Sequence, residues 1–142
     1  MICANPDFQV TLPSGSVGYM PGVIASAYEE LGGTVSYFGK PHPPAYAEAL
    51  KLLGPEVLRS RVLMVGDSLL HDIAGANAAG IDSLLVAGGI HADELGVPDA
   101  AKAATEKDSG AGRGGVLTDG ALERVFAARG VQPTMSTPAF RW

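Results

Sequence analysis

Residues 62–65 and the two aspartates that follow them constrain the fold most strongly. These four residues read Val-Leu-Met-Val, and such an unbroken apolar run is typical of a parallel strand that is buried on both faces. Asp67 stands at the end of this predicted strand, and Asp72 falls in the first turn of a helix predicted over residues 70–79. The pattern therefore predicts two carboxylates at the carboxyl end of a sheet, where open α/β sheets bind their ligands.

The two aspartates allow two interpretations. Mg²⁺ is usually held by one or two carboxylates together with phosphate oxygens and water, so Asp67 and Asp72 suit a magnesium site. Alternatively, Asp67 caps a turn, and Asp72 only places a negative charge at a helix start, where the backbone dipole favours it. The two residues alone do not decide between these interpretations.

A second motif lies upstream at residues 39–43, which read Gly-Lys-Pro-His-Pro. It follows a strand predicted over residues 34–38 and precedes an amphipathic helix predicted over residues 44–53. Proline is well tolerated near a helix start, so we expect Lys40 on a stiff loop where its charge can meet a phosphate. A lysine of this kind, taken by itself, is more often simply solvated.

Together, the two motifs resemble those of a known family. The Gly-Lys-Pro segment at residues 39–41, followed by GDSLLHD at residues 66–72, is similar to motifs III and IV of the haloacid dehalogenase (HAD) superfamily of phosphohydrolases. More narrowly, the chain resembles subfamily IIA, which is similar to the nucleotide, pyridoxal phosphate and phosphoglycolate phosphatases. The segments that carry this narrower resemblance, nearly throughout the chain, are residues 4–7, 21–22, 39–41, 66–67, 78–81 and 138–142.

The resemblance implies an α/β fold of the Rossmann-like HAD type, a three-layer sandwich with a mainly parallel sheet. Residues 1–33 would form the end of a cap region and the helix that leads back to the core. Residues 34–142 would form the C-terminal half of the core domain. The alternation of strands and helices from residue 34 onward independently predicts a parallel sheet with right-handed crossovers.

The resemblance also implies Mg²⁺-dependent hydrolysis of a small phosphorylated metabolite through an aspartyl phosphate. It implies that Lys40 screens the phosphoryl group, that Asp67 is a metal ligand and that Asp72 is a catalytic second acid. The substrate-binding residues stay open. The weaker candidates for them are Asn5, Ser68 and His91.

The chain departs from the family in one important way. HAD enzymes carry their nucleophile in an N-terminal Asp-x-Asp motif, and these 142 residues contain none. We therefore expect an N-terminal half to be missing, with Met1 an internal methionine of a longer parent and the chain alone inactive. Because the strand ending at Asp67 would then have an open apolar edge, we also expect self-association into a homo-oligomer as an alternative to pairing with the missing half.

Composition excludes several classes of partner. A net charge of −5 and a pI near 5.0 argue against a nucleic-acid-binding surface, which needs clustered Lys and Arg. No apolar run approaches the length of a membrane span, so we expect no membrane partner and a cytoplasmic location. The single cysteine, Cys3, excludes an intrachain disulfide and is expected to pack as a small apolar residue.

Two other readings of the chain stay open. In the first, the HAD-like half-core is a non-catalytic module for binding or oligomerisation. In the second, it is a complete flavodoxin-like or receiver-like domain whose acids bind Mg²⁺ for regulation, although its first predicted strand at residues 1–4 lacks the acid pair that a receiver needs.

The remaining elements follow from apolar periodicity and from the Gly and Pro residues. We expect a loop at residues 7–20, a helix at 21–31, a strand at 82–87, a strand at 114–117 and a helix at 119–129 capped by Thr118 or Asp119. Residues 110–115 formally match GxGxxG, but they precede a predicted strand rather than a helix. A surface loop is therefore favoured over a dinucleotide site.

Overall fold

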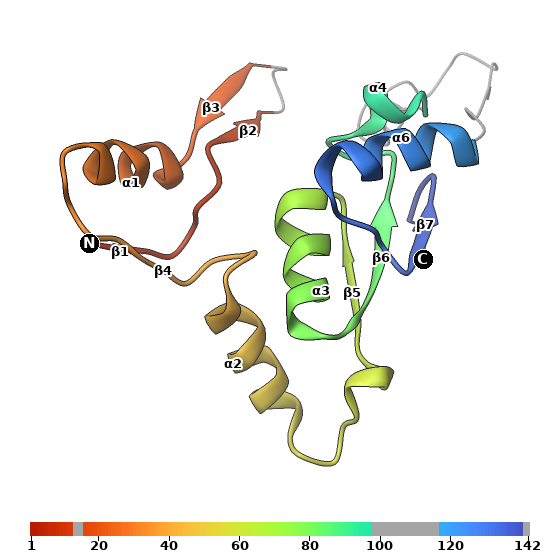
Figure 1. Cartoon of the computed structure of the whole chain (residues 1–142), viewed down its shortest axis with the longest axis horizontal. Helices are drawn as coiled ribbons and strands as arrows, with labels where there is room; N and C mark the ends of the chain where they lie inside the picture. Colours follow the sequence, from red (N-terminus) through yellow and green to blue (C-terminus); the bar gives the residue numbers. More distant parts are fainter. Residues whose placement is uncertain (13–15, 98–116, 141–142) are drawn as a thin grey trace. The chain divides into compact units, whose positions relative to one another are not determined.

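The computed structural model describes residues 1–12, 16–97 and 117–140, and it divides into two compact units (Figure 1). Unit 1 is Met1–Gly54 and unit 2 is Pro55–Trp142. Each unit is described by itself. The division expected from the family resemblance, at residue 33, stays a prediction.

Unit 1 is built around a short parallel pair of strands. Strands β1 (Ile2–Cys3) and β4 (Ser36–Tyr37) pair in parallel. Between them the chain forms a hairpin and then helix α1 (Pro21–Glu30). Helix α2 (Pro43–Leu53) follows β4, with prolines at its first positions, where their missing N–H groups would have had no partner within the helix. Cys3 is 4% exposed, which confirms that it packs as a small apolar residue.

The loop expected at residues 7–20 is wrong, because much of this segment is an antiparallel hairpin. Strand β2 (Gln9–Thr11) pairs with β3 (Val17–Tyr19), and the Leu12 N–H donates to the Ser16 carbonyl at 2.9 Å. The expectation gave too much weight to the turn-forming residues between the two strands. Residues 8–12 alternate between apolar and polar side chains, which is the pattern of a strand.

Unit 2 is a three-stranded parallel sheet with helices packed on it (Figure 1). The strand order is β5-β6-β7, with β5 at Leu63–Gly66, β6 at Asp82–Val86 and β7 at Met135–Thr137. A short 3-10 helix, η1 (Arg59–Arg61), precedes β5. The helices are α3 (Ala74–Ala79), α4 (Ala92–Leu95) and α6 (Asp119–Arg129). This parallel pairing confirms the α/β fold class.

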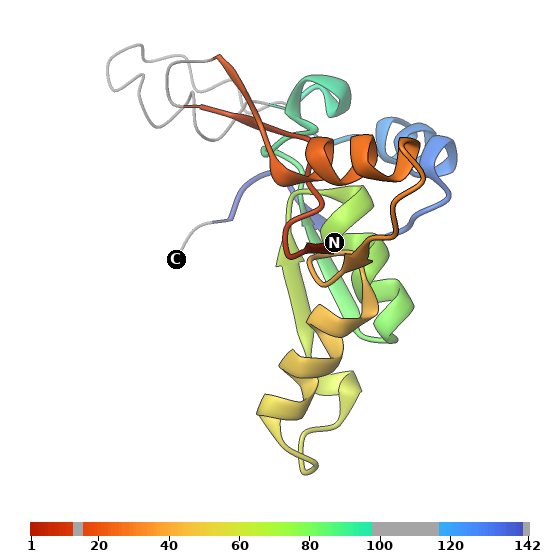
Figure 2. The same ribbon diagram turned by 90° about the vertical axis from the view of Figure 1, so that its left-hand side faces the viewer.

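The core of unit 2 lies on one face of its sheet. Leu85 of β6 is 0% exposed and packs in one cluster with Leu69, Ile73, Leu95 and Val125 from the helical segments. Figure 2 accordingly shows α3 and α6 on the same side of β5 and β6.

The other face of this sheet carries apolar side chains that unit 2 leaves uncovered. Leu63 pairs with Asp82 and Val65 with Leu84, so the two β5 residues point to the face opposite Leu85. They are 43% and 39% exposed. Among the described residues, β5 pairs only with β6 and is an edge strand of the sheet.

The helix after β5 begins with an unusual turn. The π-helical turn η2 (Leu69–Ile73) runs directly into α3, because Ile73 and Ala74 both have right-handed helical dihedral angles. Gly80 then ends the helix with φ of 65°, a conformation that costs glycine little. The helix expected at residues 70–79 is therefore confirmed, while its π-helical start was not predicted.

The other expected elements agree with the structure to different degrees. The helix at 119–129 is confirmed with the same bounds, with Thr118 at its N-cap position, although no side chain caps it. Strand β7 was not predicted. The strand expected at 114–117 and the GxGxxG match at 110–115 lie outside the described residues, apart from Leu117, which is not in a strand.

None of the described helices combines the length and the apolar character that a membrane span requires.

We expect Leu85→Ala to lower the free energy of unfolding by about 2–5 kcal/mol, because the lost side chain leaves a cavity in the core. Leu63→Ala, on the neighbouring strand but on the exposed face, is the matched control and should cost less than about 1 kcal/mol. Urea unfolding followed by circular dichroism measures both variants. Equal losses would contradict the assignment of the core to the Leu85 face.

Candidate functional site

Asp67 lies at the carboxyl end of β5, directly after Gly66. Its side chain is fixed from the loop after β6, because the Ile90 N–H donates to Asp67 Oδ2 at 3.2 Å. Since β5 and β6 are parallel, the loops that follow them meet at the same edge of the sheet. Parallel pairing thus explains how residues 67 and 90, which are 23 positions apart, come into contact.

Asp72 is buried, with 3% of its surface exposed, and it turns back toward the loop after β5. Its Oδ2 accepts a hydrogen bond from the Ser68 N–H at 3.0 Å. The Ser68 hydroxyl in turn accepts from the His71 N–H at 3.2 Å and lies 2.9 Å from His71 Nδ1. Ser68 and Asp72 therefore accept hydrogen bonds from backbone N–H groups at the helix start, which have no acceptor within the helix.

Two glycines make room for the two carboxylates. A Cβ added at Gly66 would overlap the Asp72 carboxylate, and one added at Gly89 would overlap the Asp67 carboxylate. Neither glycine has a positive φ, so their role here is steric rather than conformational. Asp72 is thus packed directly against the last residue of β5, and Asp67 against the backbone of the loop after β6.

His91 contacts the same turn from the loop after β6. The Leu69 N–H donates to His91 Nε2 at 3.2 Å, so this ring nitrogen carries no proton. The proton of the neutral ring is then on Nδ1, which lies 3.3 Å from Glu94 Oε2 and donates to it. Leu69 is 0% exposed, and leaving its N–H without an acceptor would cost about 1–3 kcal/mol.

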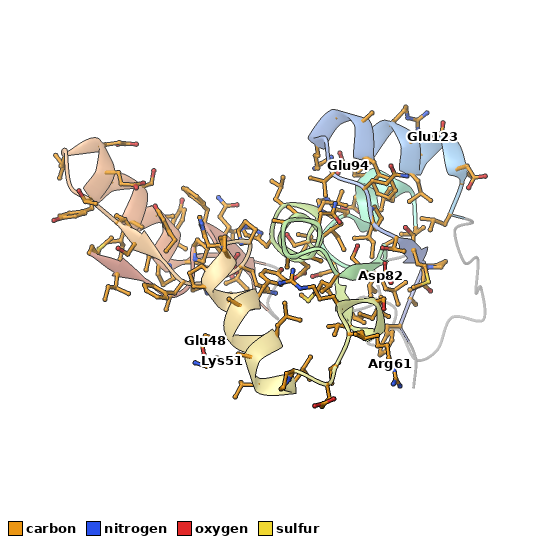
Figure 3. All side chains as sticks on the ribbon, turned by 60° about the horizontal axis from the view of Figure 1, so that its bottom comes forward. Glu48, Lys51, Arg61, Asp82, Glu94 and Glu123 are labelled. Atoms are coloured by element: carbon orange, nitrogen blue, oxygen red, sulfur yellow. The ribbon has the colours of Figure 1, made fainter. Side chains whose placement is uncertain are left out.

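Glu94 and Arg129 continue this contact into α6. Arg129 Nη1 and Nη2 donate to Glu94 Oε1 and Oε2 at 2.9 and 2.8 Å, which is the two-pronged geometry of a strong ion pair. Figure 3 labels Glu94 beside α6. The pair joins α4 to the last turn of α6, although the two residues are 35 positions apart.

The charges of this group favour a neutral His91 beside an ionised Glu94. Burial lowers the pKa of His91 below its ordinary value, and the hydrogen bond with Glu94 only partly opposes this. The hydrogen bond from Arg129 lowers the pKa of Glu94. Both directions agree with the hydrogen-bond geometry, in which His91 Nε2 is an acceptor.

Asp67 is the residue of this site that could hold a hard cation. The described residues contain no group of three or more His, Cys, Asp or Glu side chains arranged around a metal position. The contact with Ile90 uses Oδ2 of Asp67, so Oδ1 is the atom that suits an ion. Mg²⁺ is the ion commonly bound in this way, with water and phosphate completing its shell.

Lys40 belongs to unit 1, in the turn between β4 and α2. Gly39 packs closely on the loop after β1, because a Cβ added there would overlap Pro6 and the Ala4 carbonyl. The rings of Tyr37 and His42 stack across the turn, with centroids 4.7 Å apart. Lys40, which is exposed, therefore belongs to a well-fixed turn.

Asn5 lies in the loop after β1, at the same edge of unit 1 as the Lys40 turn, because β1 and β4 are parallel. Its Oδ1 accepts from the Asp7 N–H at 3.0 Å, which is an Asx turn. The structure thus brings Asn5 and the Lys40 turn to one edge of unit 1. In unit 2 it brings together Asp67, Ser68, Asp72 and His91.

Sequence reasoning missed Glu94 and Arg129. Neither residue belongs to a recognisable motif, and their pairing depends on how α4 and α6 pack. The sequence did contain one signal for the position of His91, since His91 closely follows the carboxyl end of the strand predicted at residues 82–87.

Comparison with known proteins gives the same picture. The family model described as HAD-hydrolase-like matches residues 37–107, half of the chain. A dihydroxyacetone phosphatase of Corynebacterium glutamicum (strain R) is 33% identical over 92 residues, which are 65% of this chain and 33% of that protein.

Two solved structures are similar over nearly the whole chain. A haloacid dehalogenase-like hydrolase from Brucella suis 1330 is 31% identical with a TM-score of 0.64, over 99% of this chain and 44% of that one. A p-nitrophenyl phosphatase from Archaeoglobus fulgidus is 25% identical with a TM-score of 0.62, over 97% and 42%. This chain thus spans about a third of the curated relative and less than half of either structure.

These likenesses confirm the Rossmann-like α/β fold of the HAD type that the sequence motifs implied. The matched region contains both motifs, from the Lys40 turn through the Asp67 and Asp72 carboxylates. The chain therefore belongs to the HAD-hydrolase-like family.

Proposed function

We propose that this chain supplies the lysine and the acidic, metal-binding part of a site that hydrolyses phosphate monoesters with the help of Mg²⁺. The relatives named above support the reaction type, since one is a dihydroxyacetone phosphatase and another a p-nitrophenyl phosphatase. A small phosphorylated metabolite is accordingly the substrate class. The cytoplasm, where single cysteines stay reduced, is the compartment that suits this proposal.

One observation carries the proposal: within the described parts of the chain, Asp67 is fixed at the carboxyl end of β5 by a hydrogen bond to one of its oxygens, Oδ2. A carboxylate that capped its own turn would accept from an amide two or three residues later. The Leu69 amide, two residues after Asp67, instead donates to His91, and Asp67 accepts from the loop after β6. This arrangement favours a metal ligand over a turn cap.

In this proposal each charged group has one task. Asp67 would hold Mg²⁺, which when bound stabilises the negative charge that develops on the phosphoryl oxygens. Lys40 would supply a point charge for a phosphate. Asp72 would keep the turn at residues 67–69 in place through the Ser68 N–H, and so act through the backbone. Ser68 and Asn5 stay weaker candidates for contact with substrate.

The attacking carboxylate is the part that these 142 residues do not supply, because they contain no Asp-x-Asp motif. The aspartyl-phosphate route that the family resemblance implies needs such a group. We therefore propose that the chain binds Mg²⁺ but, on its own, hydrolyses phosphate esters poorly or not at all.

A non-catalytic binding or oligomerisation module is the alternative function. The observation that favours it is the exposed apolar face of the unit 2 sheet, with Leu63 and Val65 on the edge strand. This alternative predicts self-association without binding of Mg²⁺ or phosphate. Light scattering beside the titrations described next separates the two functions.

We expect Asp67→Asn to weaken Mg²⁺ binding by roughly tenfold or more. Loss of a residue that only orients a metal ligand typically lowers metal affinity about tenfold to a hundredfold, so loss of the ligand itself should lower it at least as much. Asp93→Asn is the matched control, because it removes one exposed carboxylate from unit 2. Isothermal titration of the whole chain with MgCl₂ measures the affinities. Equal binding by both variants would reject Asp67 as the ligand.

We expect Lys40→Met to weaken binding of inorganic phosphate in the presence of Mg²⁺, because the point charge on the turn is lost. Lys51→Met is the control. Lys51 is an exposed lysine of the same unit that forms a surface pair with Glu48 at 3.6 Å (Figure 3). A phosphate titration followed by ³¹P NMR gives the result, and a loss of binding in Lys51→Met alone would contradict the role of Lys40.

We expect Gly89→Ala to reduce Mg²⁺ affinity because its Cβ would displace the Asp67 carboxylate. Gly120→Ala is the matched control, since nothing lies within 4 Å of a Cβ added there. The same Mg²⁺ titration measures both, with circular dichroism to verify folding. Unchanged affinity in a folded Gly89→Ala protein would show that the ion does not bind where Asp67 is packed.

We expect the sequence-verified 142-residue protein to show little turnover of p-nitrophenyl phosphate with Mg²⁺. Release of nitrophenolate measures the rate, and Lys40→Met is the control for a contaminating phosphatase. Robust turnover that is lost in Lys40→Met would contradict the proposed inactivity, because the chain would then contain its own nucleophile.

A further inference from the structure

Three side chains form a continuous path from the Asp67 turn, defined as residues 67–69, to the last turn of α6. His91 Nε2 accepts from the Leu69 N–H at 3.2 Å, and His91 Nδ1 lies 3.3 Å from Glu94 Oε2. Arg129 Nη2 donates to the same Glu94 oxygen at 2.8 Å. The path therefore connects the loop after β5, the start of α4 and the end of α6 through side chains that no sequence motif groups together.

We propose that His91, Glu94 and Arg129 are positioning residues that fix the Asp67 turn. Their combined effect is to hold the Leu69 N–H, two residues after Asp67, against the loop that follows β6. The second contact between the same loops is the hydrogen bond from the Ile90 N–H to Asp67 Oδ2. One bond fixes the backbone of the turn and the other fixes its carboxylate.

The structure favours this role over direct contact of His91 with substrate. Both ring nitrogens already have partners, and the side chain is only 11% exposed. A substrate ligand would need a nitrogen that faces the reacting group. His91 instead uses one nitrogen to accept from Leu69 and the other to donate to Glu94.

The Asp67 turn needs an acceptor at this position. The first N–H groups of a helix lack partners within it, and Leu69 is the first residue of η2. The neighbouring donors are satisfied within the segment, since Asp72 accepts from the Ser68 N–H and the Ser68 hydroxyl from the His71 N–H. The Leu69 N–H is satisfied from outside the segment, by His91.

Glu94 and Arg129 give this acceptor its orientation. Glu94 accepts the Nδ1 proton and so selects the ring form whose Nε2 is unprotonated. Arg129 holds both oxygens of Glu94 in a two-pronged pair. Loss of either residue should therefore weaken the contact at Leu69 without removing the imidazole.

The functional consequence rests on the proposed role of Asp67 as the metal ligand, whereas the positioning itself can be measured without metal. Amide hydrogen exchange of Leu69 reports its hydrogen bond, and the ¹⁵N shifts of the His91 ring report which nitrogen is protonated. We expect a single neutral form in the wild type, with the proton on Nδ1. A proton on Nε2 would overturn the proposal without any variant.

We expect His91→Ala to speed exchange of the Leu69 amide by roughly tenfold and to lower Mg²⁺ affinity by roughly tenfold to a hundredfold. His91→Gln offers a side-chain oxygen near the position of Nε2, and it should restore most of both. This rescue separates positioning from mere packing. Unchanged Leu69 exchange in His91→Ala, or a folded His91→Gln protein that restores neither property, would overturn the proposal.

Milder variants keep the test open if His91→Ala does not fold. Arg129→Ala should speed Leu69 exchange and weaken Mg²⁺ binding, while Arg124→Ala removes the same charge from an exposed position of α6 and should change neither. Equal effects of the two variants would overturn the role of Arg129. If the wild type binds no Mg²⁺, the proposed function fails, and Leu69 exchange alone decides the positioning role.

Discussion

The parallel pairing of β5 with β6 is the interaction on which the candidate site depends. It places the loop after each strand at the same edge of the sheet, which brings Asp67 within hydrogen-bond distance of Ile90. The close approach of the two loops is possible because Gly89 has no side chain to displace the Asp67 carboxylate. Gly66 makes the corresponding space for Asp72. The site is thus set by strand order and by the absence of two β-carbons.

The buried start of the helix after β5 explains why so many polar groups gather there. Water has little access to this turn, because Leu69 and Ile73 are 0% exposed and Ser68 and Asp72 are 8% and 3% exposed. Every backbone donor that the helix leaves without a partner must then be satisfied by protein. Asp72, Ser68 and His91 each accept from one of these donors. A turn held by three such bonds has little freedom, which is what an ion-binding carboxylate needs.

The sequence predicted the parts of this arrangement that depend on local pattern. The strand before Asp67, the helix after it and the helix at 119–129 all follow from apolar periodicity and from glycines at element ends, and the structure contains them. The hairpin formed by β2 and β3 was missed because turn-forming residues outweighed a short alternating pattern. Strand β7 was missed because Met135–Thr137 has only three residues, and its strand conformation depends on pairing with β6.

The part of the site that one segment supplies was the easiest to predict. Asp67, Ser68 and Asp72 lie within six consecutive residues, so a motif could contain them. The contact between Glu94 and Arg129 spans 35 positions and depends on how α4 packs against α6. The tautomer of His91 depends on that contact and on the position of Leu69. No pattern along the chain contains this information, because it arises from tertiary packing.

Each of the two turns that carry the charged groups is fixed inside its own unit. In the part of the chain that the structure describes, the hydrogen bonds of the Asp67 turn to Asp72, His91 and Ile90 lie within unit 2. The Lys40 turn is fixed by Gly39 against Ala4 and Pro6, within unit 1. The apolar face that the unit 2 sheet exposes is the face opposite the core that η2, α3 and α6 cover. A partner that covers that face is therefore not needed to form the Asp67 turn, because the described hydrogen bonds that hold this turn come from unit 2.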